Sequence, residues 1–145
     1  MEFIADLHIH SRFSRATSRE CCPEKLDFWA RRKGIHVLGT GDFTHRAWRR
    51  ELAEKCDPAG DGFYTLKPEL RENVDVPGVA QAKFVVSGEI SSIYKKNGRT
   101  RKVHNVILLP SLEAAESCPR DSKPSATSIP TAGPFWDSTA NYCLT

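Results

Sequence analysis

Short apolar runs along the chain predict buried strands that alternate with helices. The runs are rich in Val, Ile and Phe, which favour strands, and turn-forming residues separate them. They comprise residues 3–10 (FIADLHIH), 35–40 (IHVLGT), 82–89 (AKFVVSGE) and 103–109 (VHNVILL). We expect all four runs to lie in one sheet with buried faces.

A helix is predicted between the first two runs. Pro23 suits a first helical turn and Gly34 suits the residue that ends a helix. Phe28 and Trp29 are expected to pack in the core rather than to form a platform for stacked bases. A strand, a helix and a second strand in this order predict a parallel strand pair.

A second amphipathic helix is predicted over residues 46–56. Trp48, Leu52 and Cys56 recur every four residues and define its buried face. The other positions are expected to form an ordinary exposed face, namely Arg49, Arg50, Glu51, Glu54 and Lys55. Residues 57–77, rich in Pro, Gly and acids, are predicted to be an irregular excursion, and Ser111 is predicted to cap a short helix.

Composition limits the class of protein. With 145 residues, of which 39% are hydrophobic and 27% charged, the chain is expected to form one soluble domain. No apolar run reaches the ~20 residues that span a bilayer, and no signal pattern opens the chain, so we expect a cytoplasmic protein without a membrane partner. The five cysteines lack C-x-x-C spacing and are expected to be free thiols.

Two histidines close the first apolar run. Alternate residues of a strand share a face, so His8 and His10 can converge on one ion while Leu7 and Ile9 point into the core. Asp6 can orient one of the rings from behind. By itself such a pair also occurs by chance, and its neighbours along the chain decide its meaning.

The other predicted strands carry further metal-ligand types at their ends. Asp42 follows the second run, Glu89 ends the third, and His104 lies near the start of the fourth. Together with the histidine pair, these residues predict a site for divalent metal ions. His45 can bind metal, orient Asp42 or contact phosphate, and the sequence leaves these alternatives open.

Two groups of cations are candidates for phosphate binding. Arg12 and Arg15 follow the histidine pair in a loop that either holds phosphate oxygens or is simply solvated. Asn97-Gly98 predicts a hairpin turn surrounded by the cations Lys95, Lys96, Arg99, Arg101 and Lys102. This basic hairpin suits a duplex backbone, or it is an edge kept charged against aggregation.

The order of these motifs resembles a known family. DLHIHS, GTGDFTH, SGEIS and KVHNVILL follow one another as in the first half of the PHP (polymerase and histidinol phosphatase) metal-hydrolase superfamily. Gly41-Asp42, where the commoner motif reads T-D-H, resembles the endonuclease Q branch. The resemblance covers residues 1–116 and implies an α/β fold, the first half of a PHP-type distorted (β/α) barrel.

The resemblance also implies a mechanism. His8, His10 and Glu89 would bind a first ion, Glu89 and His104 a second, and Asp42 a third, with zinc, manganese or magnesium as the metals. The ions would activate water, so that no side chain acts as a nucleophile. The expected partner is DNA that contains deaminated bases, cut on their 5′ side during repair.

The family continues well beyond these motifs, so weak or absent catalysis is expected. Two alternatives stand beside the endonuclease: a phosphoesterase acting on a small phosphate ester, and a fragment that binds metal or DNA without turnover.

Residues 117–145 differ in character from the rest of the chain. They are rich in Pro, Ser and Thr, lack helical or strand periodicity, and are expected to be disordered. Residues 121–138 can be written in codons whose shifted frame spells LEAIGNIHSDGRPILGL, similar to the family's own continuation. We therefore interpret this tail as a frameshift product, which the nucleotide sequence would test.

Overall fold

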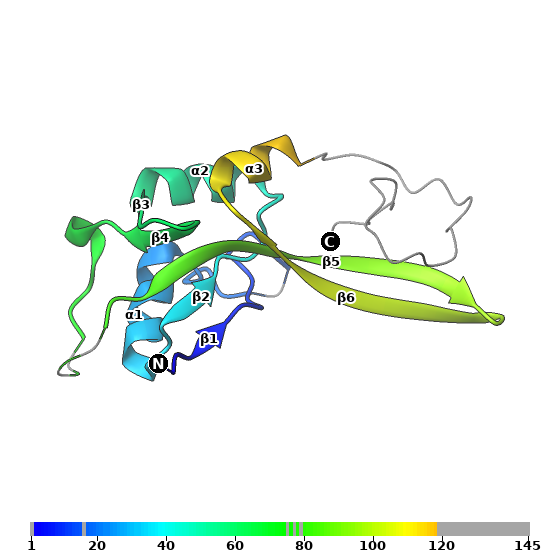
Figure 1. Cartoon of the computed structure of the whole chain (residues 1–145), viewed down its shortest axis with the longest axis horizontal. Helices are drawn as coiled ribbons and strands as arrows, with labels where there is room; N and C mark the ends of the chain where they lie inside the picture. Colours follow the sequence, from blue (N-terminus) through cyan, green and yellow to red (C-terminus); the bar gives the residue numbers. More distant parts are fainter. Residues whose placement is uncertain (1, 16, 75, 77, 79, 119–145) are drawn as a thin grey trace.

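The computed structural model describes residues 2–15, 17–74, 76, 78 and 80–118. Within them the chain folds as a mixed α/β structure with a six-stranded sheet (Figure 1). The strand order is β1 (Ala5–Asp6), β2 (Val37–Gly39), β5 (Lys83–Lys96), β4 (Phe63–Leu66) and β3 (Cys56–Pro58), and β6 (Arg99–Leu109) pairs with the far part of β5. The β1, β2 and β5 strands run parallel, as predicted for the first two.

The first strand is much shorter than predicted. β1 has two exposed residues and ends at Asp6, so His8 and His10 lie in the segment that follows it. That segment crosses closely over the end of β2, where a Cβ on Gly39 or Gly41 would overlap the carbonyl oxygens of Leu7 and Ile9. The two glycines therefore allow a tight backbone crossing in place of further strand pairing.

The first helix has the predicted ends. α1 (Pro23–Lys33) starts with Pro23 and ends at Gly34, whose φ of 71° is left-handed. The expectation that Trp29 is buried was wrong, because its side chain is 47% exposed. Its ring instead lies beneath the cationic groups of Arg32 and Lys33, at 5.5 and 6.0 Å from the ring centroid.

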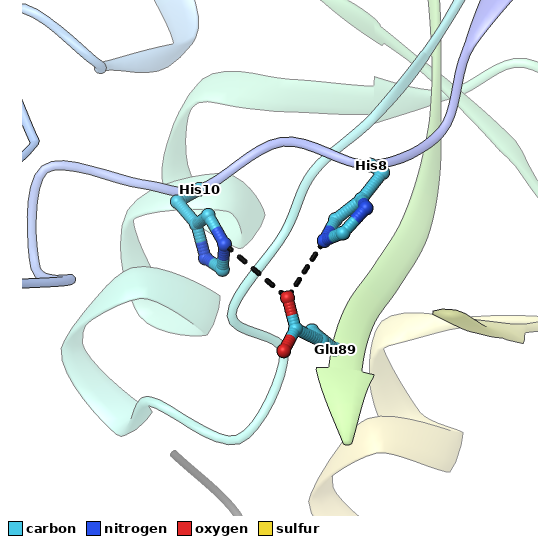
Figure 2. Close-up of side chains that lie close together, drawn as sticks. All are labelled: His8, His10 and Glu89. Carbon is cyan, nitrogen blue, oxygen red and sulfur yellow. Dashed lines mark hydrogen bonds and ion pairs between the residues drawn. The ribbon is translucent and has the colours of Figure 1, made fainter. Parts of the chain in front are cut away.

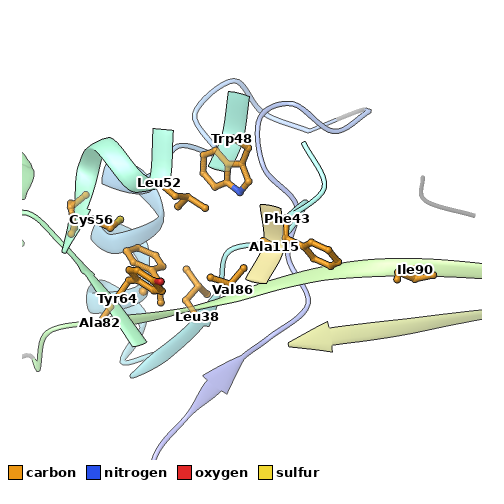
Figure 3. Packing of buried hydrophobic residues seen from close by; sticks show 13 residues of the cluster. Leu38, Phe43, Trp48, Leu52, Cys56, Tyr64, Ala82, Val86, Ile90 and Ala115 are labelled. Atoms are coloured by element: carbon orange, nitrogen blue, oxygen red, sulfur yellow. The ribbon is translucent and has the colours of Figure 1, made fainter. Parts of the chain in front are cut away.

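The second helix, α2 (Arg46–Lys55), packs on more sides than predicted. Its face of Trp48 and Leu52 is buried against β2, β4 and β5, together with Cys56 just after the helix (Figure 3). The prediction of an exposed charged face was wrong for Arg49 and Glu51, which are 3% and 7% exposed. Arg49 donates to the Phe43 carbonyl oxygen at 2.7 Å, since the helix also packs on the loop before it.

The segment predicted to be irregular contains two strands. β3 and β4 form an antiparallel pair, and β4 joins the sheet beside β5 with Phe63 opposite Val85. Tyr64 and Leu66 supply the buried face of β4. A four-residue strand among Gly and Pro gave too short a pattern to recognise. A 3₁₀ turn, η1 (Pro68–Leu70), follows it.

The predicted hairpin is confirmed and is longer than expected. Asn97 and Gly98, at φ 53° and 72°, connect β5 and β6, which pair from Lys96↔Arg99 back to Val86↔Leu109. Between Glu89–Lys96 and Arg99–Val106 they form a projecting two-stranded ribbon (Figure 1), called the ribbon below. The prediction that residues 103–109 are buried was wrong, because Val103, Val106 and Leu108 are 39%, 39% and 47% exposed.

The last described element is α3 (Leu112–Ser117), capped as predicted by the Ser111 hydroxyl, which accepts from Ala114 N–H. Cys21, Cys22, Cys56 and Cys118 are free thiols, and burial raises the pKa of Cys56 to about 12. No helix in the described ranges is long and apolar enough to cross a membrane. The interpretation of the tail remains a prediction, because residues 119–145 lie outside the described part of the chain.

Candidate metal centre

Three predicted ligands converge on one point. His8, His10 and Glu89 each offer a ligand atom, and these atoms all lie within 4.8 Å of one another (Figure 2). The Oε2 atom of Glu89 is 2.7 Å from His8 Nε2 and 3.6 Å from His10 Nε2. Two ligands of a tetrahedral zinc ion are about 3.3 Å apart at the usual bond lengths. The donor set and its spacing therefore fit a small divalent cation.

A fourth predicted ligand faces the other oxygen of the same carboxylate. His104 lies on β6 and contacts Glu89 Oε1 through Nδ1. The two oxygens of Glu89 thus face different imidazoles. Hydrogen bonds hold the pKa of Glu89 below its ordinary value. The bond with His8 has the largest effect and the bond with His104 adds to it, although burial opposes this shift.

Glu89 is placed by the point at which β5 leaves the sheet. Its neighbours Gly88 and Ile90 are buried, so strand alternation turns Glu89 to the opposite face. A Cβ on Gly88 would overlap the Phe43 ring, so glycine lets the strand pack closely here. The Glu89 side chain remains 10% exposed. The carboxylate is therefore fixed by its neighbours and still accessible to solvent.

Asp42 lies behind the cluster rather than inside it. Its Oδ1 is 3.1 Å from His10 Nδ1, and its Oδ2 accepts the N–H and the hydroxyl of Ser11 at 2.7 and 2.6 Å. Asp6, expected to orient a ring, instead accepts the backbone N–H of His8 at 3.4 Å. Sequence reasoning did not predict the contact of Ser11 with Asp42, because a serine after H-x-H carries no signal for such a partner.

Two other candidates are engaged elsewhere. His45 caps α2, with Nδ1 accepting from Trp48 N–H at 3.4 Å, and its ring stacks on Phe13 with centroids 4.4 Å apart. Arg12 donates to Glu51 Oε2 at 2.7 Å, whereas Arg15 is exposed. A phosphate would therefore compete with Glu51 for Arg12.

The ribbon divides its five cations between two faces. Residues that are opposite in an antiparallel pair share a face, so the register Glu89↔Val106 puts His104, Lys102 and Lys95 on the Glu89 face. The remaining cations lie on the other face, namely Lys96, Arg99 and Arg101. Two of the five cations therefore share a face with the candidate ligands Glu89 and His104.

A comparison with curated protein sequences found a relative of this chain. The chain is 31% identical over 111 residues to an uncharacterised protein of Methanocaldococcus jannaschii, and the match covers 77% of this chain and 10% of that protein. No family model matches the chain.

Two solved structures share the fold, and each match covers 77% of this chain and 23% of the other. One is the lesion-specific endonuclease PfuEndoQ from Pyrococcus furiosus, with 28% identity and a TM-score of 0.55. The other is endonuclease Q in complex with a 27-mer duplex that has an abasic lesion at the active site, with 28% identity and a TM-score of 0.54. The chain therefore has a fold similar to part of endonuclease Q.

Proposed function

We propose that the chain carries the metal-binding part of an endonuclease Q-type enzyme of the PHP superfamily, which hydrolyses DNA on the 5′ side of deaminated bases. The observation that carries the proposal is the convergence of two imidazoles on one oxygen of Glu89, with a third imidazole on its other oxygen. Carboxylates that bridge two ions use their oxygens in this divided way.

The described residues divide into ligands and supports. His8, His10 and Glu89 would hold the first ion, and Glu89 with His104 the second. A third ion at Asp42 would have to share Oδ1 with His10, because Ser11 occupies Oδ2. When bound, a divalent ion such as zinc or manganese lowers the pKa of water and neutralises phosphate charge.

DNA would reach the centre along the ribbon. Lys95 and Lys102 share the face of Glu89, and Arg15 is exposed in the loop after His10. Cations in such positions bind phosphates without reading sequence. Since the chain spans 23% of the solved endonuclease Q chains, we expect metal and DNA binding to be detected more readily than turnover.

The first test measures metal binding. Titration of the metal-free protein with Zn²⁺ or Mn²⁺ should show binding that Glu89→Gln weakens at least about tenfold, because it removes the oxygen charge that both sites share. Glu54→Gln is the matched control, since Glu54 lies on α2 with a side chain 66% exposed. Equal affinity in the wild-type protein and Glu89→Gln would refute the metal centre.

The second test distinguishes the activities. Duplexes with one deoxyuridine or deoxyinosine, an undamaged duplex and p-nitrophenyl phosphate are each incubated with the metal-loaded protein. Cleavage 5′ to the lesion supports the endonuclease. Hydrolysis of the small ester alone would favour the phosphoesterase, and binding without any cleavage would favour the non-catalytic fragment.

A further inference from the structure

We propose that Ser11 is a positioning residue of the metal centre. Through Asp42 it holds His10 with the proton on Nδ1, so that Nε2 is free to bind an ion beside Glu89. The inference rests on the proposed function for its metal, but the contacts that carry it and its spectroscopic test do not require metal.

The hydrogen bonds around Asp42 indicate which ring nitrogen of His10 carries the proton. Ser11 is fully buried and donates both its N–H and its hydroxyl to Oδ2 of Asp42, which leaves Oδ1 for His10 Nδ1. Asp42 already accepts two hydrogen bonds from Ser11, and we assign it the acceptor role toward His10 as well, with the proton on Nδ1. A neutral imidazole with that proton has its lone pair on Nε2.

The lone pair then faces another acceptor. His10 Nε2 is 3.6 Å from Oε2 of Glu89, and two acceptors at that separation are stabilised by a cation between them. A ligating histidine whose second nitrogen donates to a carboxylate is a more basic and better oriented ligand. Asp42 therefore orients His10 for metal, and Ser11 orients Asp42.

The backbone prevents Asp42 from moving away. Asp42 has a left-handed φ of 46°, which Asp tolerates better than most residues. The turn is held on both sides: Gly41 N–H donates to the Ser87 hydroxyl at 3.0 Å, and Trp48 Nε1–H donates to the Gly41 carbonyl oxygen at 3.0 Å. The backbone of Asp42 is therefore fixed, and the hydrogen bonds from Ser11 set the orientation of its carboxylate.

Ser11 is itself held by the loop that follows it. Its carbonyl oxygen accepts the Thr17 hydroxyl at 2.8 Å and the Ser14 N–H at 3.1 Å, and its hydroxyl oxygen accepts Phe13 N–H at 3.2 Å. His8 is less constrained, with a side chain 50% exposed against 36% for His10. The described contacts thus single out His10 as the preorganised ligand.

The test compares Ser11→Ala with Ser14→Ala, a serine in the same loop whose hydroxyl makes no hydrogen bond among the described residues. Long-range ¹H–¹⁵N spectra of the imidazoles in metal-free protein report which nitrogen carries the proton. Wild type and Ser14→Ala should show His10 protonated at Nδ1, whereas Ser11→Ala should show a mixture of tautomers. Zn²⁺ affinity should fall about tenfold in Ser11→Ala and be unchanged in Ser14→Ala.

Ser11→Thr, which retains a hydroxyl, should recover part of both properties. If Ser11→Ala fails to fold, Asp42→Asn tests the same network of contacts. Its neutral amide should no longer hold His10 in a single tautomer. The proposal is overturned if wild-type His10 carries its proton on Nε2, or if Ser11→Ala changes neither tautomer nor affinity. A wild-type protein with the expected tautomer but no metal affinity would refute the metal centre while leaving the positioning contact intact.

Discussion

The two halves of β5 belong to one continuous strand, but the first half is buried within the sheet and the second half projects into solvent. Phe84 and Val85 pair with β2 on one side and with β4 on the other, and Phe84 and Val86 are at most 1% exposed. Beyond Ser91, β6 is the only strand among the described residues that pairs with β5, and Ile93 is 59% exposed. The first half is stabilised by burial of apolar surface, whereas the second depends on its hydrogen-bond ladder and its turn.

The candidate centre lies at the boundary between these halves. Gly88 packs on Phe43 and Ile90 is 5% exposed, so the backbone on either side of Glu89 is anchored in the core. His104 reaches the same carboxylate from the projecting strand. A centre in this position has rigid support on one side and an open approach on the other, which a large substrate such as DNA requires.

The largest expected effect is on the free energy of unfolding, when alanine replaces either of two isoleucines of β5. Ile90→Ala should lower the free energy of unfolding by about 2–4 kcal/mol, because Ile90 is buried. Ile93→Ala should change it by no more than about 0.5 kcal/mol, because most of that side chain is already in water. Urea unfolding followed by circular dichroism measures both. Similar losses would mean that the ribbon is packed against something in solution.

An intermediate effect is expected for the two faces of the ribbon. Neutralising one phosphate contact flattens the slope of log K against log salt by about 0.9 on duplex DNA. Lys95→Ala/Lys102→Ala, on the Glu89 face, should therefore flatten it by up to about 1.8, and Arg99→Ala/Arg101→Ala, on the opposite face, by less. Fluorescence anisotropy across a salt series gives the slopes.

The two double variants remove the same charge and so control for each other. Equal flattening by both pairs would show that DNA surrounds the tip rather than lying on one face. No flattening by either pair would leave the ribbon cations as protection of a strand edge.

The smallest expected effect is confined to the turn. Gly98 has a φ of 72°, and no heavy atom lies within 4 Å of the position that a Cβ would take. Gly98→Val therefore causes backbone strain rather than a steric clash. We expect a cost of about 1 kcal/mol or more within the ribbon. Faster amide exchange should appear at Tyr94 and Arg101, which form a hydrogen-bonded pair of the ladder, but not at Phe84. Asn97→Gly, compatible with the same turn, should leave exchange nearly unchanged, and faster exchange at Phe84 in Gly98→Val would join the two halves into one cooperative unit.

Local signals in the sequence determined the elements that local physics controls. Pro23 and Gly34 define the ends of α1, Ser111 caps α3, and Asn97-Gly98 makes the hairpin turn, because each acts within a few residues of itself. Periodicity also determined the buried face of Trp48 and Leu52. His8, His10, Glu89 and His104 were recognisable as candidate ligands because few other types of side chain bind divalent ions.

Only the tertiary structure decided which surfaces are covered and which ligands meet. Periodicity tells which residues share a face, but not whether another element packs on it, so Trp29 is exposed and Arg49 is buried against expectation. The contact of Asp42 with Ser11 and His10 depends on a left-handed turn clamped by β5 and α2. Such contacts join residues about 30 positions apart, and they exist only after the sheet has brought the two loops together.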